Sequence, residues 1–90
     1  MPLNTTMPWF LYLLKCSDGT FYAGITNDLE KRLLAHNEGK GAKYTRGRAP
    51  LELLASKACE SRSSALKEEA AVKKLPKNQK IKFFNAKIID

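Results

Sequence analysis

Two polar side chains lie on the apolar face of a predicted helix. Residues 28–38 have helical spacing, and four of them fall on one face by the i, i+3, i+4, i+7 rule: Leu29, Arg32, Leu33 and His36. The leucines must face a core, so the guanidinium and the imidazole lie beside the buried stripe, as in the lining of a cleft. A guanidinium there suits a phosphate, which it binds through two hydrogen bonds. For an isolated helix, an arginine that reaches to solvent and a boundary histidine are the simpler explanation.

Two tyrosines and two carboxylates extend this set of groups. Tyr12 and Tyr22 lie in successive predicted strands, which can bring them onto one face of a sheet. Buried tyrosines usually do no more than form hydrogen bonds. Glu68 and Glu69 both fall within the apolar arc of a second predicted helix, and periodicity does not decide which one faces inward. A carboxylate in that arc needs a partner or a metal, whereas Lys73 offers Glu69 a surface pair at i+4.

Short elements must position these groups. The apolar run from Trp9 to Leu14 predicts a buried strand, and a Ser-Asp-Gly turn leads from it into the alternating segment Thr20 to Ile25. The two segments predict a β-hairpin, because Asp-Gly is a strong hairpin turn pair.

The remaining chain predicts helices and one more strand. Asn27 and Glu30 resemble a capping box for the first helix, and Gly39 suits the position after its end. LELLAS, after Pro50, predicts a third strand, and Ser61 caps a second helix that ends before proline. Residues 77–90 fit a helix or a strand equally well. The order β-β-α-β-α predicts an α+β fold, with a small three-stranded, mainly antiparallel sheet flanked by helices, in one domain over residues 1–90.

Composition excludes several classes of protein. The 90 residues include 16 Lys and Arg against 9 Asp and Glu, for a net charge of +7, and 43% of them are hydrophobic. Such a chain is globular rather than disordered. The two cysteines are too few for a disulfide scaffold, and the single histidine argues against a structural zinc site. The longest apolar run is far shorter than the roughly 20 residues that span a bilayer. We expect a cytoplasmic protein without membrane contact.

The positive charge is concentrated in residues 31–90, which include a basic, glycine-containing loop, GKGAKYTRGRA, over residues 39–49. A basic surface of this kind is typical of proteins that bind nucleic acid, because contacts with phosphates release counterions. Solubility explains the charge equally well.

The order and spacing of these segments resemble the GIY-YIG nuclease superfamily. Phe10-Leu11-Tyr12 stands where the family has GIY, and Tyr22-Ala23-Gly24 stands where it has YIG. Arg32 and His36 follow at the family's spacing. The resemblance covers about residues 8–82, as the core of a single nuclease domain. It is closest to small stand-alone bacterial members, and the chain is also similar to the N-terminal nuclease domain of the excinuclease C subunit.

The resemblance implies a role for each matching residue. Tyr12 is the expected general base toward the attacking water, and Tyr22 supports it or shares that task. Arg32 holds the scissile phosphate, and His36 assists proton transfer or orients the phosphate. Glu69, which matches the family's glutamate better than its neighbour does, binds one divalent cation, Mg²⁺ or Mn²⁺.

Two functions from different classes follow. The first is a metal-dependent endonuclease that hydrolyses DNA, in repair or recombination, and that is targeted either by a protein partner or by the structure of the DNA. The alternative is a non-catalytic DNA- or RNA-binding module within a larger assembly. In either case DNA is favoured over RNA.

The basic loop is expected to act in two ways. It tracks the phosphate backbone, and its cations, together with Arg32 and the metal, lower the pKa of the tyrosine base. Tyr44 either stacks on a base or anchors the loop. The loop residues expected to contact nucleic acid are Lys40, Lys43, Tyr44, Arg46 and Arg48.

Overall fold

The structure, a computed structural model, describes residues 8–85. Its elements, in chain order, are β1 (Trp9–Lys15), β2 (Phe21–Thr26), α1 (Leu29–Asn37), a 3-10 helix (Lys43–Thr45), β3 (Glu52–Cys59), α2 (Arg62–Lys73) and α3 (Lys77–Asn85). The predicted α+β class is confirmed. The terminal segment, which the sequence left open, is helical as far as Asn85, and residues 86–90 lie outside the described part. No helix in the described part is long and apolar enough to cross a membrane.

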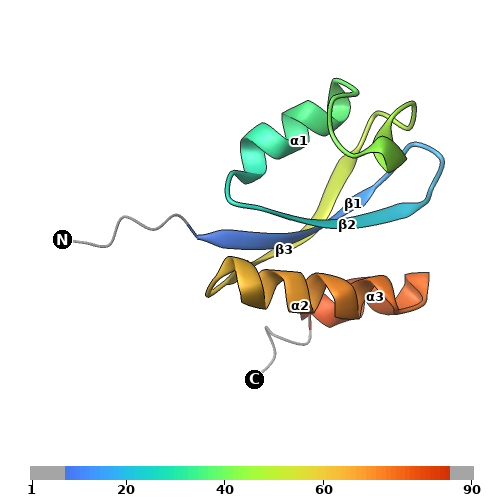
Figure 1. Cartoon of the computed structure of the whole chain (residues 1–90). Helices are drawn as coiled ribbons and strands as arrows, with labels where there is room; N and C mark the ends of the chain where they lie inside the picture. Colours follow the sequence, from blue (N-terminus) through green and yellow to red (C-terminus); the bar gives the residue numbers. More distant parts are fainter. Residues whose placement is uncertain (1–7, 86–90) are drawn as a thin grey trace.

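β1 is the central strand of the sheet, and β2 and β3 pair with it on either side in antiparallel orientation (Figure 1). Its apolar run explains this position, because a strand covered on both faces needs apolar side chains at consecutive positions. Residues 11–14 are all buried. In the hairpin register, Tyr12 lies opposite Gly24 and Leu14 lies opposite Tyr22. Both tyrosines therefore point to the same face of the sheet.

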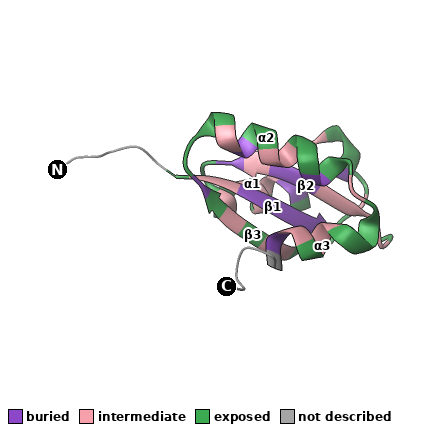
Figure 2. Cartoon of the chain, turned by 90° about the horizontal axis from the view of Figure 1, so that it is seen from below, coloured by how far each residue is buried: buried purple, intermediate pink, exposed green. Residues whose placement is uncertain are grey.

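The helices cover the two faces unequally. α2 and α3 lie on one face and α1 lies on the other (Figure 1). Beneath α2 and α3 is the larger apolar cluster, which includes Leu11, Leu13, Ala65, Val72 and Phe84. Figure 2 shows β1 buried beneath these two helices, whose outward sides are exposed. The smaller cluster beneath α1 consists of Tyr12, Leu14, Cys16 and Leu51, with Tyr22, Leu29 and Leu33 packed against it. Polar aromatic groups are therefore concentrated on the α1 face.

The predicted N-cap is confirmed for α2 and is wrong for α1. Ser61 caps α2 as predicted, through reciprocal hydrogen bonds of 3.1 Å with Ser64. The predicted cap of α1 by Asn27 is wrong: Asp28 is the N-cap, and its Oδ1 accepts a hydrogen bond of 3.1 Å from the Lys31 amide. The cause is Thr26, whose Oγ1 accepts from the Asp28 amide at 3.0 Å as β2 ends and so holds that residue outside the helix. The helix is accordingly one residue shorter at each end than predicted.

The assignment of Asp28 as the N-cap of α1 can be tested by mutation. Asp28→Ala removes the acceptor of the Lys31 amide and is expected to lower the free energy of unfolding by about 1 kcal/mol. Asn27→Ala, next to it in the chain, leaves that acceptor in place and is expected to change stability little. Urea denaturation followed by Trp9 fluorescence measures both. An equal loss in the two variants would contradict the assignment of the cap.

Candidate active site

A line of three buried polar side chains crosses the space between the sheet and α1. Tyr12 from β1 lies with its Oη 2.9 Å from Nε2 of His36, which is in the last turn of α1. On the other side of the imidazole, Nδ1 lies 2.8 Å from Oγ1 of Thr45 in the 3-10 helix. None of the three side chains is more than 1% exposed. The histidine, which was expected in the lining of a cleft or at the boundary of the core, is instead fully buried and hydrogen-bonded to Tyr12.

Two glycines make this close packing possible. Gly24 lies opposite Tyr12 in the hairpin, and a Cβ there would lie 2.5 Å from the tyrosine Oη. A Cβ at Gly41 would overlap the His36 ring and would come within 2.9 Å of its Cα, which cannot move aside. Any larger residue at either position would push the hydrogen-bonded pair apart. Gly24, the glycine of the Tyr-Ala-Gly motif, is therefore required because a side chain there would collide with Tyr12.

Thr45 and Gly41 are site residues that sequence analysis missed. Both belong to the basic loop, which was interpreted only through its charged and aromatic residues. One signal for Gly41 was available in the sequence, its position only two residues after Gly39. Gly39 itself follows the end of α1 and has a φ of +78°. Gly39 serves the helix end through this positive φ and has open space around it, so a further glycine so soon after it indicates a close approach of the backbone at Gly41.

Arg32 lies on α1 beside the tyrosine hydroxyl and is partly buried. Its Nε is buried without a hydrogen-bond partner, and no other buried side-chain nitrogen or oxygen in the described residues lacks one. An unpaired buried donor on a charged group is costly. This nitrogen is therefore able to donate a hydrogen bond to an acceptor from outside the chain.

Burial has the largest effect on the pKa values of Tyr12 and His36. Desolvation raises the pKa of Tyr12 above its usual value of 10.0, although hydrogen bonding to Arg32 opposes the rise. Desolvation, followed by the charge of Arg32, lowers the pKa of His36 to about 4. The imidazole is therefore neutral at neutral pH and available as a hydrogen-bond acceptor. Our expectation of a lowered tyrosine pKa is not met in the free protein, because burial outweighs the nearby cation.

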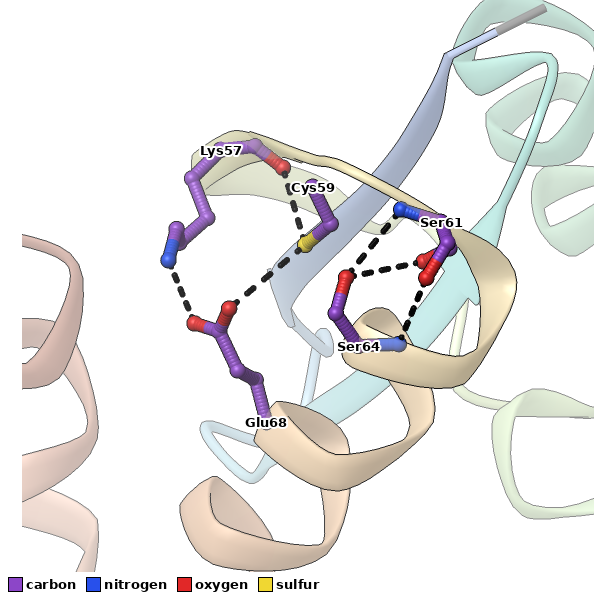
Figure 3. A network of polar contacts seen from close by, with 5 residues as sticks. All are labelled: Lys57, Cys59, Ser61, Ser64 and Glu68. Atoms are coloured by element: carbon purple, nitrogen blue, oxygen red, sulfur yellow. Dashed lines mark hydrogen bonds and ion pairs between the residues drawn. The ribbon is translucent and has the colours of Figure 1, made fainter. Parts of the chain in front are cut away.

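The adjacent carboxylates of α2 have separate surroundings. Glu68 forms an ion pair with Lys57 of β3 and lies 3.9 Å from the Cys59 sulfur (Figure 3). Glu69 lies on the other side: its charge acts on Tyr12, and its Oε2 is 3.2 Å from Nζ of Lys73. Periodicity did not separate the two carboxylates; the ion pair of Glu68 with Lys57 and the effect of the Glu69 charge on the pKa of Tyr12 favour Glu69 as the carboxylate of the site.

Tyr22 and the basic loop form the outer part of the site. The ring of Tyr22 is 5.4 Å from that of His36 and stacks on Tyr44, with centroids 5.7 Å apart. The guanidinium of Arg48 lies 4.3 Å from the Tyr44 ring and pairs with Asp18 in the hairpin turn at 3.0 Å. These contacts favour Tyr44 as an anchor of the loop. Three other residues expected to contact nucleic acid have exposed side chains: Lys40, Lys43 and Arg46.

The site thus combines groups that suit one kind of chemistry. A neutral imidazole bonded to a phenol can move a proton, an unpaired guanidinium nitrogen can bind a phosphate oxygen, and a nearby carboxylate can hold a cation. Groups of these kinds suit the cleavage of a phosphodiester bond.

Comparison with known protein families also indicates a nuclease domain. Residues 8–82 match the GIY-YIG catalytic domain, and the chain belongs to this family. GIY-YIG is a nuclease family that generally uses a divalent metal, and the match indicates nucleic acid as the substrate class.

Small bacterial proteins of similar length resemble the chain over most of its residues. It is 48% identical to a UPF0213 protein of Xanthomonas axonopodis pv. citri, over 93% of this chain and 82% of the relative. It is 52% identical to a UPF0213 protein of Cupriavidus pinatubonensis, over 90% of each. The names of these relatives specify no activity.

Two solution NMR structures share the fold. One is of a protein from E. faecalis, with a TM-score of 0.67 and 41% identity, covering 94% of this chain and 91% of that one. The other is of a UPF0213 protein from Bacillus halodurans, with a TM-score of 0.56 and 42% identity, covering 90% and 86%. The predicted resemblance to small bacterial members of the family is confirmed.

The buried neutral histidine makes stability depend on pH. Because the pKa of His36 falls from 6.5 to about 4 on folding, the unfolded chain binds a proton in this range that the folded chain does not. The free energy of unfolding is therefore expected to fall as the pH decreases from about 6.5 to 4, by at most about 1.4 kcal/mol per pH unit. Denaturant unfolding at several pH values measures this slope.

His36→Gln is the control for this measurement. It removes the titrating group, so the variant is expected to be less stable at neutral pH but to show a flatter dependence on pH. Asp18, whose pKa is lowered to about 2, stabilises the fold above its usual pKa and loses that effect only at lower pH, below the window. A variant with the slope of the wild type would show that another group takes up the proton.

Proposed function

We propose that the protein is a metal-dependent endonuclease that hydrolyses phosphodiester bonds in DNA. The observation that carries the proposal is the hydrogen bond between Tyr12 and His36, next to the unpaired Nε of Arg32, in a domain of a nuclease family. A purely structural role leaves the buried guanidinium nitrogen unexplained.

Arg32 is the proposed phosphate ligand. Its planar guanidinium matches the geometry of two phosphate oxygens, and a bound phosphate would supply the missing acceptor of Nε. A phosphate there would also offset the positive charge that contributes to the low pKa of His36. Substrate binding would therefore make the imidazole a better proton acceptor at the moment it is needed.

Tyr12 and His36 are the proposed path for the proton of the attacking water. The water gives a proton to the Tyr12 oxygen while the phenol proton moves to Nε2 of His36, and the resulting hydroxide bonds to phosphorus. The bond from phosphorus to the leaving sugar oxygen breaks, and that oxygen takes a proton from solvent. The imidazolium then releases its proton to solvent, which restores the neutral histidine. The raised pKa of Tyr12 supports coupled transfer rather than a tyrosinate formed in advance.

Access to the tyrosine hydroxyl distinguishes the two tyrosines. Tyr12 is only 1% exposed, whereas Tyr22 is half-buried. For a water to reach the Tyr12 hydroxyl, the side chains that cover it would therefore have to move aside. Tyr22, whose ring contacts both His36 and Tyr44, is the proposed support on the outer side.

Glu69 is the proposed ligand of a divalent cation. No group of three or more His, Cys, Asp or Glu side chains in the described residues is arranged to hold a metal. Mg²⁺ does not require one, because it keeps several waters and binds through one or two carboxylates and substrate phosphates. Glu69 supplies one such carboxylate, and the cation would take the place of the ammonium of Lys73, which now lies 3.2 Å from its Oε2. The cation would neutralise developing charge on the phosphate.

A cleavage assay tests the proposed function. Purified protein with Mg²⁺ or Mn²⁺ is expected to cut at least one of single-stranded, duplex, flapped or branched DNA. Glu69→Gln is expected to reduce the rate by about 100-fold or more while DNA binding is retained. Glu68→Gln is the matched control, because the adjacent carboxylate pairs with Lys57 and should be dispensable for cleavage. If binding occurs without cleavage of any DNA or RNA substrate, the protein is the non-catalytic module instead.

Salt dependence tests the role of the loop. Lys43 and Arg46 are exposed beside the site, and each phosphate contact contributes about 0.9 to the slope of log K against log salt for duplex DNA. Replacing both with Gln is expected to weaken binding and to reduce this slope by about 2. Lys67→Gln, on the exposed side of α2, is expected to leave the slope unchanged. Equal slopes in the loop variant and the wild type would remove the loop from the interface.

A further inference from the structure

The hydroxyl of Thr45 is buried at the inner end of the tyrosine–histidine line. Thr45 is 0% exposed, although it lies in a loop that is mostly exposed and basic. Its Oγ1 lies 2.8 Å from Nδ1 of His36 and 2.8 Å from the carbonyl oxygen of Ala42. Neither the charge of the loop nor the proposed phosphate contacts require a hydroxyl at this point.

The position of the threonine proton follows from its two neighbours. A hydroxyl has one proton to donate and two lone pairs, and a carbonyl oxygen can only accept. Two oxygens 2.8 Å apart need a proton between them, so Thr45 donates its proton to the carbonyl of Ala42. The same hydroxyl therefore has no proton left for the imidazole and must accept one from Nδ1.

The proton on Nδ1 determines that the other ring nitrogen, Nε2, is unprotonated. A neutral imidazole has only one N–H, so Nε2 is left with a lone pair that faces the Tyr12 hydroxyl 2.9 Å away. The phenol then donates to Nε2. We propose that Thr45 is a positioning residue that fixes His36 as the Nδ1–H tautomer and so directs its acceptor nitrogen to Tyr12.

The surrounding loop is built to hold this hydroxyl. Gly41 lets the backbone pass against the His36 ring, and the 3-10 helix places Thr45 three residues after the carbonyl to which it donates. The end of the loop is fastened to the hairpin turn, where the amide of Ser17 donates to the carbonyl of Arg48 at 2.8 Å. The inner side of the loop thus supports the histidine, while its exposed side chains carry the positive charge.

The tautomer follows from the hydrogen bonds alone, and only its effect on catalysis rests on the proposed function. With the opposite tautomer, Nε2 would donate to the Tyr12 oxygen and could not take its proton. Loss of the threonine hydroxyl is therefore expected to slow cleavage without removing any group that contacts the substrate.

Nitrogen-15 NMR of the single histidine tests the assignment directly. In the full-length protein at neutral pH, Nδ1 is expected in the protonated, pyrrole-like range and Nε2 in the unprotonated, pyridine-like range. Thr45→Val keeps the shape of the side chain without the hydroxyl and is expected to shift the population toward Nε2–H. Thr45→Ser is expected to restore the wild-type pattern. Thr20→Val, which removes an exposed hydroxyl bonded to Asp18, is the control and should not change it.

Two results would overturn the proposal. The first is an Nε2–H pattern in the wild type, and the second is a wild-type pattern in a folded Thr45→Val. If the valine variant does not fold, Thr45→Ala and Thr45→Ser make the same comparison of a missing and a retained hydroxyl.

Cleavage measured on the same variants tests the catalytic consequence. Thr45→Val is expected to lose about 100-fold in rate with DNA binding retained, and Thr45→Ser to recover most of it. A tautomer shift in a protein whose wild type cuts nothing would refute the proposed function and leave the role of Thr45 standing. A tautomer shift without loss of cleavage would refute the catalytic effect of the tautomer.

Discussion

The hydrogen bond between Tyr12 and His36 is the interaction on which the other features of the site depend. It joins the central strand to the last turn of α1 in an interior where an unpaired polar atom would be costly. Each partner needs a gap in the surrounding backbone, which Gly24 and Gly41 provide. The bond thus explains two glycines and the buried position of a histidine that an ordinary amphipathic helix would leave at the boundary of the core.

The two faces of the sheet differ in the kind of side chain that they bury. Beneath α2 and α3, aliphatic and aromatic side chains form the larger cluster, which resembles the core of any small α+β domain. Beneath α1 the cluster is smaller, and a phenol and an imidazole occupy space that apolar side chains fill elsewhere. A domain of 90 residues has little apolar surface to bury. It can support such a polar face only because the opposite face is packed conventionally.

Periodicity and turn residues were enough to predict the hairpin, the third strand, both helices and the cap of α2. They could not decide between Asn27 and Asp28, since that choice depends on the hydroxyl of Thr26. They also left Glu68 and Glu69 equivalent, because the difference lies in partners from other elements, Lys57 on β3 and the tyrosine site. Thr45 was missed for the same reason: a threonine in a basic loop gives no sign in the sequence that it faces a buried histidine.

Positive charge has a different effect inside the site than along its edge. At the edge, exposed cations of the loop attract phosphates at a distance and are screened by salt. Inside, Arg32 is partly buried and its charge is less well screened, and it adds to the larger effect of burial in keeping His36 neutral. In the proposed function, a phosphate bound at Arg32 would offset this smaller contribution to the low pKa of His36, while the effect of burial would remain. The proposed phosphate ligand would thus also favour the proton transfer that we assign to the histidine.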